Sequence, residues 1–153
     1  LVHGKFAGTG LIVRTGPQTS PAPGSVAQLG FGPEAVHWFD PATHGLVHVD
    51  HTCDRSMDTP LPSLVQHLLI GFTQRETALE ETVPFDRREA RHVVVHARLD
   101  GVPRSLELYV MKKDGCVYDL GYVAPPERFD GGRGRFDVFV RGFHTGRSPL
   151  SAP

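Results

Sequence analysis

Two Asp-Gly pairs in the second half of the chain constrain its fold more than any other feature. Asp100-Gly101 and Asp114-Gly115 have the residue types of a two-residue type I′ turn, because both positions of that turn need positive φ. The segments around them alternate apolar and polar residues, as half-buried strands do. The sequence therefore predicts two consecutive β-hairpins over residues 91–123.

Two-residue turns also fix the register of these strands. Leu99 then pairs with Val102, Lys113 pairs with Cys116, and the remaining pairs follow by counting away from each turn. A slip of one residue would exchange the two faces. In this register one face is almost entirely aliphatic and predicts a core wall, formed by Val93, Val95, Ala97, Leu99, Leu106, Leu108, Val110, Val117, Asp119, Gly121 and Val123.

A helix over residues 61–72 is predicted to cover this wall. Thr59-Pro60 has the residue types of an N-cap followed by a first helical residue. The apolar residues after it recur at the spacing of one helical face: Leu61, Leu64, Val65, Leu68, Leu69 and Phe72.

The remaining elements complete an α+β fold. Strands are also predicted at residues 11–14, 26–31, 35–39, 46–53 and 78–85. The Gly-rich segment 130–134 is interpreted as a flexible connector. It is followed by a short helix or strand carrying Phe136, Phe139, Val140 and Phe143. We predict one domain over residues 1–145, with an antiparallel sheet of about six strands and helices on its faces, and a flexible tail over residues 146–153.

The second face of the hairpin sheet gathers polar and aromatic side chains. Glu107 lies opposite Val94 and Tyr122, and the two histidines are its diagonal neighbours at a Cβ separation of about 7–8 Å. The candidate ligand-binding residues are His92, His96, Glu107, Tyr109, Tyr118 and Tyr122.

Three interpretations of this face stay open. It is a partly solvated sheet surface, a site for a small ligand or a divalent metal, or an acid–base site with Glu107 as the base. Strand diagonals are wide for tight metal coordination, so we assign no metal ligands.

Asp119 is anomalous because it falls on the aliphatic face. A buried carboxylate needs a partner or a shifted pKa. We expect it to cap a helix N-terminus or to pair with an arginine.

The two cysteines, Cys53 and Cys116, lie at the ends of predicted strands. A disulfide between them is sterically reasonable if those strands are neighbours. An even cysteine count suits an exported protein with one disulfide, and it also suits a cytosolic protein with two thiols.

Composition and motifs exclude several classes of function. Sixteen basic and seventeen acidic residues nearly cancel, so the basic excess typical of nucleic-acid binding is missing. No apolar run approaches the ~20 residues that span a bilayer. No G-x-S-x-G, H-E-x-x-H, Walker or C-x-x-C motif occurs. We therefore expect neither an enzyme nor a cofactor.

The order of elements resembles the PsbP-like fold. That fold is shared by the extrinsic PsbP subunit of photosystem II, a Ran-binding nuclear import factor and small exported bacterial lipoproteins. The resemblance rests on L-x-x-L-V-x-x-L-L-x-x-F at 61–72, L-D-G-V-P at 99–103, K-K-D-G-C-V-Y-D-L at 112–120 and A-P-P-E-R-F at 124–129. It implies an α/β/α sandwich and a non-catalytic accessory role, and no functional residue of the family carries over.

The cysteine pair and the start at Leu1 rather than Met look most like the exported lipoproteins. This resemblance implies a periplasmic or outer-membrane-associated protein that binds a partner protein or an envelope complex. A lipid anchor upstream of Leu1 is part of that expectation.

Overall fold

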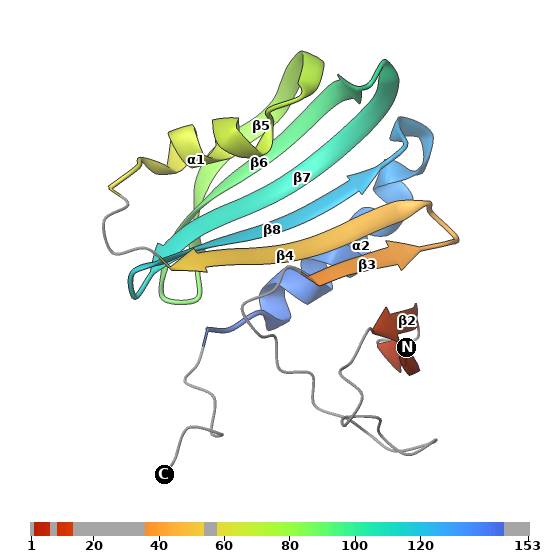
Figure 1. The fold of residues 1–153 in the computed structure, drawn as a ribbon, viewed down its shortest axis with the longest axis horizontal. Helices are drawn as coiled ribbons and strands as arrows, with labels where there is room; N and C mark the ends of the chain where they lie inside the picture. Colours follow the sequence, from red (N-terminus) through yellow and green to blue (C-terminus); the bar gives the residue numbers. More distant parts are fainter. Residues whose placement is uncertain (1, 7–8, 14–35, 54–57, 146–153) are drawn as a thin grey trace.

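The computed structural model describes residues 2–6, 9–13, 36–53 and 58–145 (Figure 1). The strand predicted at 26–31 and the tail at 146–153 lie outside them. In chain order the elements are β1 Val2–Phe6, β2 Thr9–Val13, β3 Val36–Asp40, β4 Gly45–Cys53, α1 Leu61–Leu68, β5 Phe72–Phe85, β6 Arg88–Leu99, β7 Val102–Lys113, β8 Cys116–Ala124 and α2 Pro126–Gly142.

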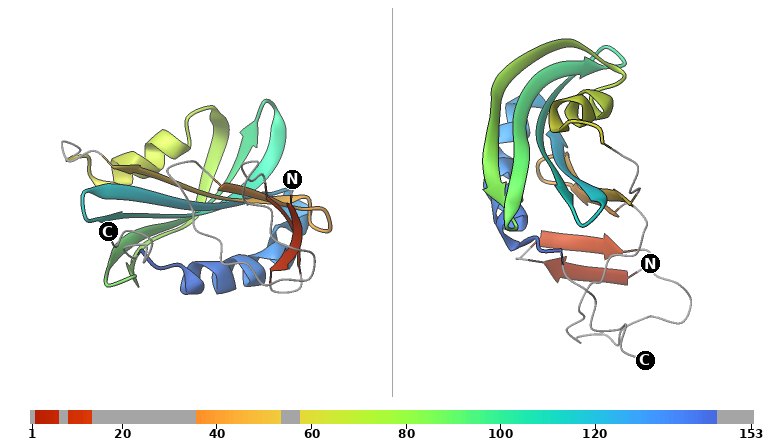
Figure 2. Two further views of the ribbon diagram at one scale, coloured as in Figure 1. Left: turned by 60° about the horizontal axis from the view of Figure 1, so that its bottom comes forward. Right: turned by 90° about the vertical axis from the view of Figure 1, so that its left-hand side faces the viewer.

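A six-stranded antiparallel sheet organises these elements, and its strand order is β3-β4-β8-β7-β6-β5. Helices α1 and α2 lie on opposite faces of this curved sheet, which confirms the predicted α+β sandwich (Figure 2). Strands β1 and β2 pair with each other in a separate two-stranded sheet.

The predicted double hairpin is confirmed in full register. Leu99 pairs with Val102 and Lys113 with Cys116. All four turn residues have positive φ, from 50° at Asp100 to 79° at Gly101. The aliphatic face packs under α1, where it forms a core with Leu64 and Val65.

Helix α1 is shorter than predicted. It ends at Leu68, because the amides of Ile70 and Phe72 bond to carbonyls three residues back and Gly71 takes a φ of 90°. Phe72, expected to end the helix, instead begins β5. Leu69 is nevertheless buried in the core under α1, as the apolar spacing predicts, although it lies beyond the end of the helix.

Strand β5 is longer than predicted and forms a further two-residue hairpin with β6. Phe85 pairs with Arg88 across a two-residue turn. The turn residues Asp86 and Arg87 have φ of 44° and 66°. This turn lacks the Asp-Gly or Asn-Gly pair that marks a type I′ turn in a sequence, because neither position holds glycine.

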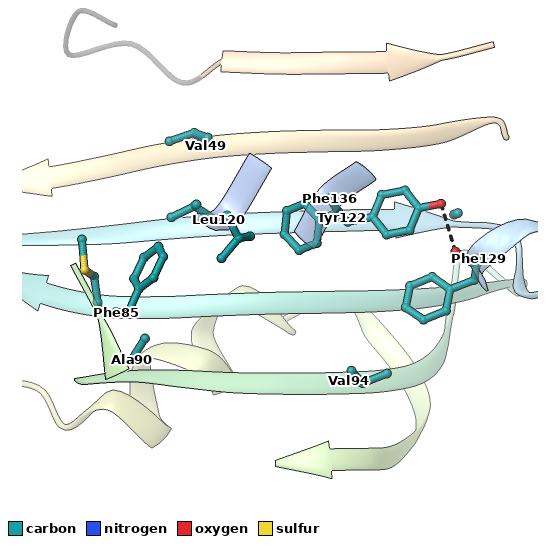
Figure 3. Close-up of a cluster of buried hydrophobic side chains, with 11 residues drawn as sticks. Val49, Phe85, Ala90, Val94, Leu120, Tyr122, Phe129 and Phe136 are labelled. Carbon is teal, nitrogen blue, oxygen red and sulfur yellow. Dashed lines mark hydrogen bonds between the residues drawn. The ribbon is translucent and has the colours of Figure 1, made fainter. Parts of the chain in front are cut away.

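Helix α2 runs straight through the segment predicted to be a flexible connector, so that prediction was wrong. Gly132 is helical because it packs against β8: a Cβ there would lie 2.0 Å from the Tyr122 hydroxyl oxygen. The close approach lets Phe129, Phe136 and Val140 cover the second face of the sheet (Figure 3). The face with the His/Glu/Tyr residues is therefore a second core.

Candidate functional site

A buried cluster of charged groups lies between the sheet and α2. His92 on β6, Glu107 on β7 and Arg133 on α2 meet there, with Glu81 on β5 at the edge. His92 and Glu107 are 7% and 6% exposed. Three consecutive strands and α2 are therefore joined by ionic hydrogen bonds.

Glu107 accepts hydrogen bonds on both carboxylate oxygens. His92 Nε2 lies 2.9 Å from Oε1, and Arg133 donates from Nε to Oε2 at 2.9 Å and from Nη2 to Oε1 at 3.1 Å. Burial raises the pKa of Glu107, but the bonds to His92 and Arg133 outweigh it, and the net pKa is lowered. Glu107 is therefore an ionised carboxylate.

His92 has a carboxylate at each ring nitrogen. Its Nδ1 lies 2.9 Å from Glu81 and its Nε2 lies 2.9 Å from Glu107. Burial lowers the pKa of His92, yet the two carboxylates raise it above its ordinary value of 6.5. This geometry fits an imidazolium that donates from both nitrogens.

Tyr109 stacks flat on His92, with ring centroids 4.1 Å apart and planes inclined by 11°. Burial, followed by the negative charges of Glu107 and Asp137, raises the pKa of Tyr109 to about 12. Its phenol is therefore neutral at physiological pH and acts as a hydrophobic and aromatic surface.

The other predicted site residues lie outside this network. His96 is exposed and its Nδ1 lies 2.8 Å from the Ser105 hydroxyl. Tyr118 stacks on His51. Tyr122 donates to the carbonyl of Phe129 at 3.3 Å (Figure 3).

Besides Glu81, the sequence analysis missed one further member of the network, Arg133. It lies between Phe129 and Phe136 on the buried face of α2, and its guanidinium is 5.5 Å from the Phe129 ring centroid. The spacing of 129, 133, 136 and 140 is that of one helical face, but the interpretation of 130–134 as a connector hid it.

The positive and negative charges of the network are equal in number, and its side chains hydrogen-bond to one another. Two carboxylates face one guanidinium and one imidazolium, so Glu107 is not a free base. No group of three or more His, Cys, Asp or Glu side chains within the described ranges is placed to hold a metal ion. The arrangement suits a structural clamp between β5, β6, β7 and α2.

An open groove of about 380 Å³ lies beside this clamp, between the β5–β6 hairpin and the C-terminal half of α2. Glu81, His92 and Tyr109 line it, so the clamp forms part of its wall. Its other lining residues are aromatic, aliphatic and charged: Val83, Pro84, Phe85, Asp86, Asp137, Val140, Arg141, Phe143 and His144.

Asp119 lies opposite Asp50 across the β4–β8 pair, and among the described residues it has neither partner expected for it. Its Oδ1 is buried and makes no hydrogen bond to any described residue. Burial, and then repulsion from Asp50, raises the pKa of Asp119 to about 6. The prediction that Asp119 caps a helix or pairs with an arginine was therefore wrong for the described part of the chain.

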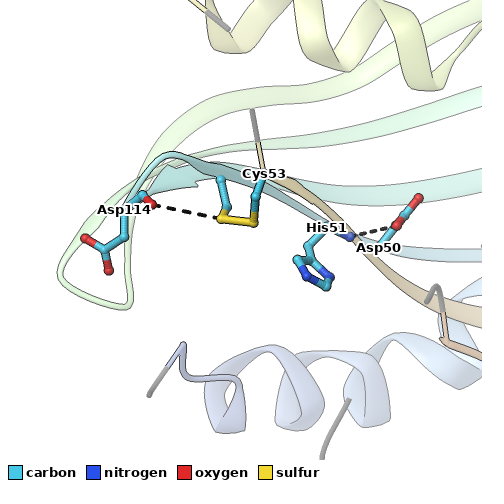
Figure 4. Close-up of a disulfide and its surroundings, with 5 residues drawn as sticks. Asp50, His51, Cys53 and Asp114 are labelled. Carbon is cyan, nitrogen blue, oxygen red and sulfur yellow. Dashed lines mark hydrogen bonds between the residues drawn. A yellow bond between two sulfur atoms is a disulfide. The ribbon is translucent and has the colours of Figure 1, made fainter. Parts of the chain in front are cut away.

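Cys53 and Cys116 form a disulfide between directly paired residues of β4 and β8 (Figure 4). Cys116 follows the Asp114-Gly115 turn, so the bond joins the end of β4 to the start of the last hairpin strand. The open choice between a disulfide and two thiols is thereby resolved.

Comparisons with known proteins identify the fold. No protein-family model matches the sequence, and no curated protein matches it. A crystal structure of a protein of unknown function from Pseudomonas aeruginosa has a TM-score of 0.63 and 7% identity, and covers 96% of this chain and 98% of its own. The solution structure of the cyanobacterial PsbP protein CyanoP from Synechocystis has a TM-score of 0.50 and 14% identity, and covers 86% and 100%.

These similarities confirm the PsbP-like fold, and at such low identity they show the fold alone. The disulfide is typical of proteins outside the cytoplasm, where disulfides persist. Neither helix in the described ranges is long and apolar enough to cross a membrane.

Proposed function

We propose that this protein is an exported, non-catalytic accessory protein that binds a partner protein in the cell envelope. The observation that carries the proposal is the saturation of the buried polar cluster. His92 and Arg133 both bond to Glu107, which leaves no free acid, base or nucleophile among these three residues. A clamp of this kind stabilises a scaffold, and the function then falls to the surfaces of the scaffold.

Export is supported by the cross-strand disulfide, since reducing compartments keep most thiols free. The proposal places the protein in the periplasm or at the outer membrane. A lipid anchor, expected from the resemblance to exported lipoproteins, belongs to the same proposal.

The experiment uses protein made in its native host. Acid quenching and alkylation before reduction should leave Cys53 and Cys116 unmodified, and the protein should elute from native extracts above its monomer mass of 16.8 kDa. Two alkylated thiols together with elution as a monomer would reject the proposal.

A second candidate function is the binding of a small organic cation in the groove beside the clamp. Phe85, Tyr109 and Phe143 line this groove, together with the carboxylates of Glu81 and Asp137, which are ion-paired with His92 and Arg141 respectively. Aromatic rings with nearby carboxylates attract alkylammonium groups. The groove volume is also within the range of small-molecule sites.

Choline and its neutral isostere 3,3-dimethyl-1-butanol test this candidate. Amide chemical shifts along the groove should move with choline only, and Asp137→Asn should weaken the response. Asp130→Asn, an exposed position of the same helix that does not line the groove, is the matched control. Equal responses to both compounds would argue against a cation site.

A further inference from the structure

The three two-residue hairpin turns of the six-stranded sheet differ at one position. The second turn residue is Gly101 in one hairpin, Gly115 in another, and Arg87 in the β5–β6 hairpin. All three have positive φ, which is unfavourable for an arginine. Backbone strain of this kind is found at functional sites, where the side chain is needed.

The preceding residue, Asp86, has a different role in the same turn. Its carboxylate accepts hydrogen bonds from Lys113 Nζ at 2.7 Å and from the backbone N and hydroxyl of Thr145, both at 2.8 Å. The carboxylate is 7% exposed, so its charge is neutralised inside the protein. Asp86 is therefore not available to neutralise the two arginines that follow it. Arg87 and Arg88 are both exposed to solvent.

An open groove of about 810 Å³ lies at this hairpin, on the side of the N-terminal end of α1. Three cations line it: Arg87, Arg88 and Lys112. None of them forms an ion pair with another described residue, whereas the neighbouring Arg91 is paired with Glu80 at 2.8 Å. The other lining residues are Leu61, Thr82, Val83, Pro84 and Glu89.

We propose that this groove binds an acidic polypeptide segment of the partner protein. The inference rests on the proposed function and names the surface that carries it. Arginine forks bind carboxylates in bidentate geometry, and arginine clusters are a common means of recognising acidic motifs. The aliphatic residues Leu61, Val83 and Pro84 add apolar contact along the same groove.

A flat anionic membrane fits the groove less well. Membrane-binding patches commonly gather about four to eight basic residues. This groove offers three, with Glu89 beside them. A concave surface with few charges and an apolar floor matches a chain segment better than a lipid surface.

Fluorescence anisotropy of a labelled hexaglutamate peptide, titrated with the full chain at low ionic strength, tests the proposal. Binding should weaken at least fivefold in Arg87→Gly and in Arg88→Gln, and should fall steeply with added salt. Arg98→Gln makes the same charge change at another hairpin and should alter binding less than twofold. A hexaglutamine peptide should not bind.

Two results would overturn the proposal: equal binding by wild type, Arg87→Gly and Arg88→Gln, or an equal loss in Arg98→Gln. Stronger binding to phosphatidylglycerol vesicles than to the peptide, with the same dependence on Arg87, would also overturn it in favour of a lipid surface. Failure here is distinguishable from failure of the proposed function, because the disulfide and the native complex are measured independently of this peptide.

Discussion

Gly132 on α2 and Tyr122 on β8 are packed so closely that a Cβ at position 132 would lie 2.0 Å from the Tyr122 hydroxyl oxygen. This contact sets how near α2 lies to the sheet. One helical residue further on, Arg133 reaches both carboxylate oxygens of Glu107. The absence of a side chain at Gly132 thus permits the buried charge cluster to close.

The first prediction is that Gly132→Ala destabilises the protein by about 2 kcal/mol or more, because overpacking forces the Tyr122 ring or the helix to move. Gly134, in the same helix, has nothing within 4 Å of its ideal Cβ position. Gly134→Ala should therefore stabilise by up to about 1 kcal/mol through helix propensity. Urea unfolding of both variants measures this, and two changes of the same sign would contradict it.

Arg87→Gly should make the protein more stable while it weakens peptide binding. The left-handed conformation costs an L-residue about 1–2 kcal/mol. Glycine offsets about 0.5–1 kcal/mol of this gain, because a glycine loses more conformational freedom on folding than an arginine does. We expect a net gain of about 0.5–1 kcal/mol in the free energy of unfolding.

The inverse change provides the control for Arg87→Gly. Gly101 occupies the equivalent turn position with φ of 79° and nothing within 4 Å of its ideal Cβ. Gly101→Arg should destabilise by a similar amount. A loss of stability in Arg87→Gly would mean that the arginine side chain stabilises the turn and is not retained for binding.

The sequence predicted the double hairpin well because its turns carry their own constraint. Asp100-Gly101 and Asp114-Gly115 specify turn type, and turn type specifies register, so β6, β7 and β8 follow from local information. The β5–β6 turn did not follow, because Asp86-Arg87 is held in the same conformation by tertiary contacts of Asp86.

The candidate site was predicted less completely for a related reason. His92 and Glu107 were placed on one face by register alone, and they do meet. Arg133 was missed because the glycines around it are typical of a loop, and packing against Tyr122 explains only Gly132 among them. Helix propensity counts glycine as unfavourable, and it does not show that Gly132 leaves the space that the Tyr122 side chain occupies.

Asp119→Asn should stabilise the protein above pH 6. The pKa of Asp119 rises from 3.8 to about 6 on folding, so the unfolded chain loses this proton first and stability falls as pH rises from about 4 to 6. That shift corresponds to about 3 kcal/mol at most, and partial exposure of Asp119 reduces it to about 1–2 kcal/mol.

Guanidinium unfolding at pH 3.5 and pH 8 measures the effect of Asp119→Asn. The variant and the wild type should have similar stability at pH 3.5, and the variant should be more stable at pH 8. Asp50→Asn should give a smaller gain of the same sign, because Asp50 is the second cause of the raised pKa. Equal stability of Asp119→Asn and wild type at pH 8 would show that Asp119 has a stabilising partner.

Arg133→Met should destabilise the protein by about 1–2 kcal/mol, since it leaves the Glu107 carboxylate with one partner fewer in a buried position. The methionine removes the charge, which also lies over the Phe129 ring, and keeps a flexible side chain at this position. Adding Glu107→Gln to Arg133→Met removes the uncompensated charge and should recover part of the loss. A double-mutant cycle that gives no coupling between the two positions would contradict the clamp.

His92→Gln addresses the pH dependence of the same clamp. The folded-state pKa of His92 is raised above 6.5 by Glu107 and Glu81 against the opposing effect of burial. Its stabilising contribution is therefore complete below pH 6.5 and is lost as pH rises through the folded-state pKa. The difference in unfolding free energy between wild type and His92→Gln should shrink from pH 6 to pH 9.

This pH range lies above the range in which Asp119 titrates, so denaturation at a series of pH values separates the effects of the two groups. A difference that stays constant across this range would mean that His92 is neutral in the folded protein and contributes only packing against Tyr109.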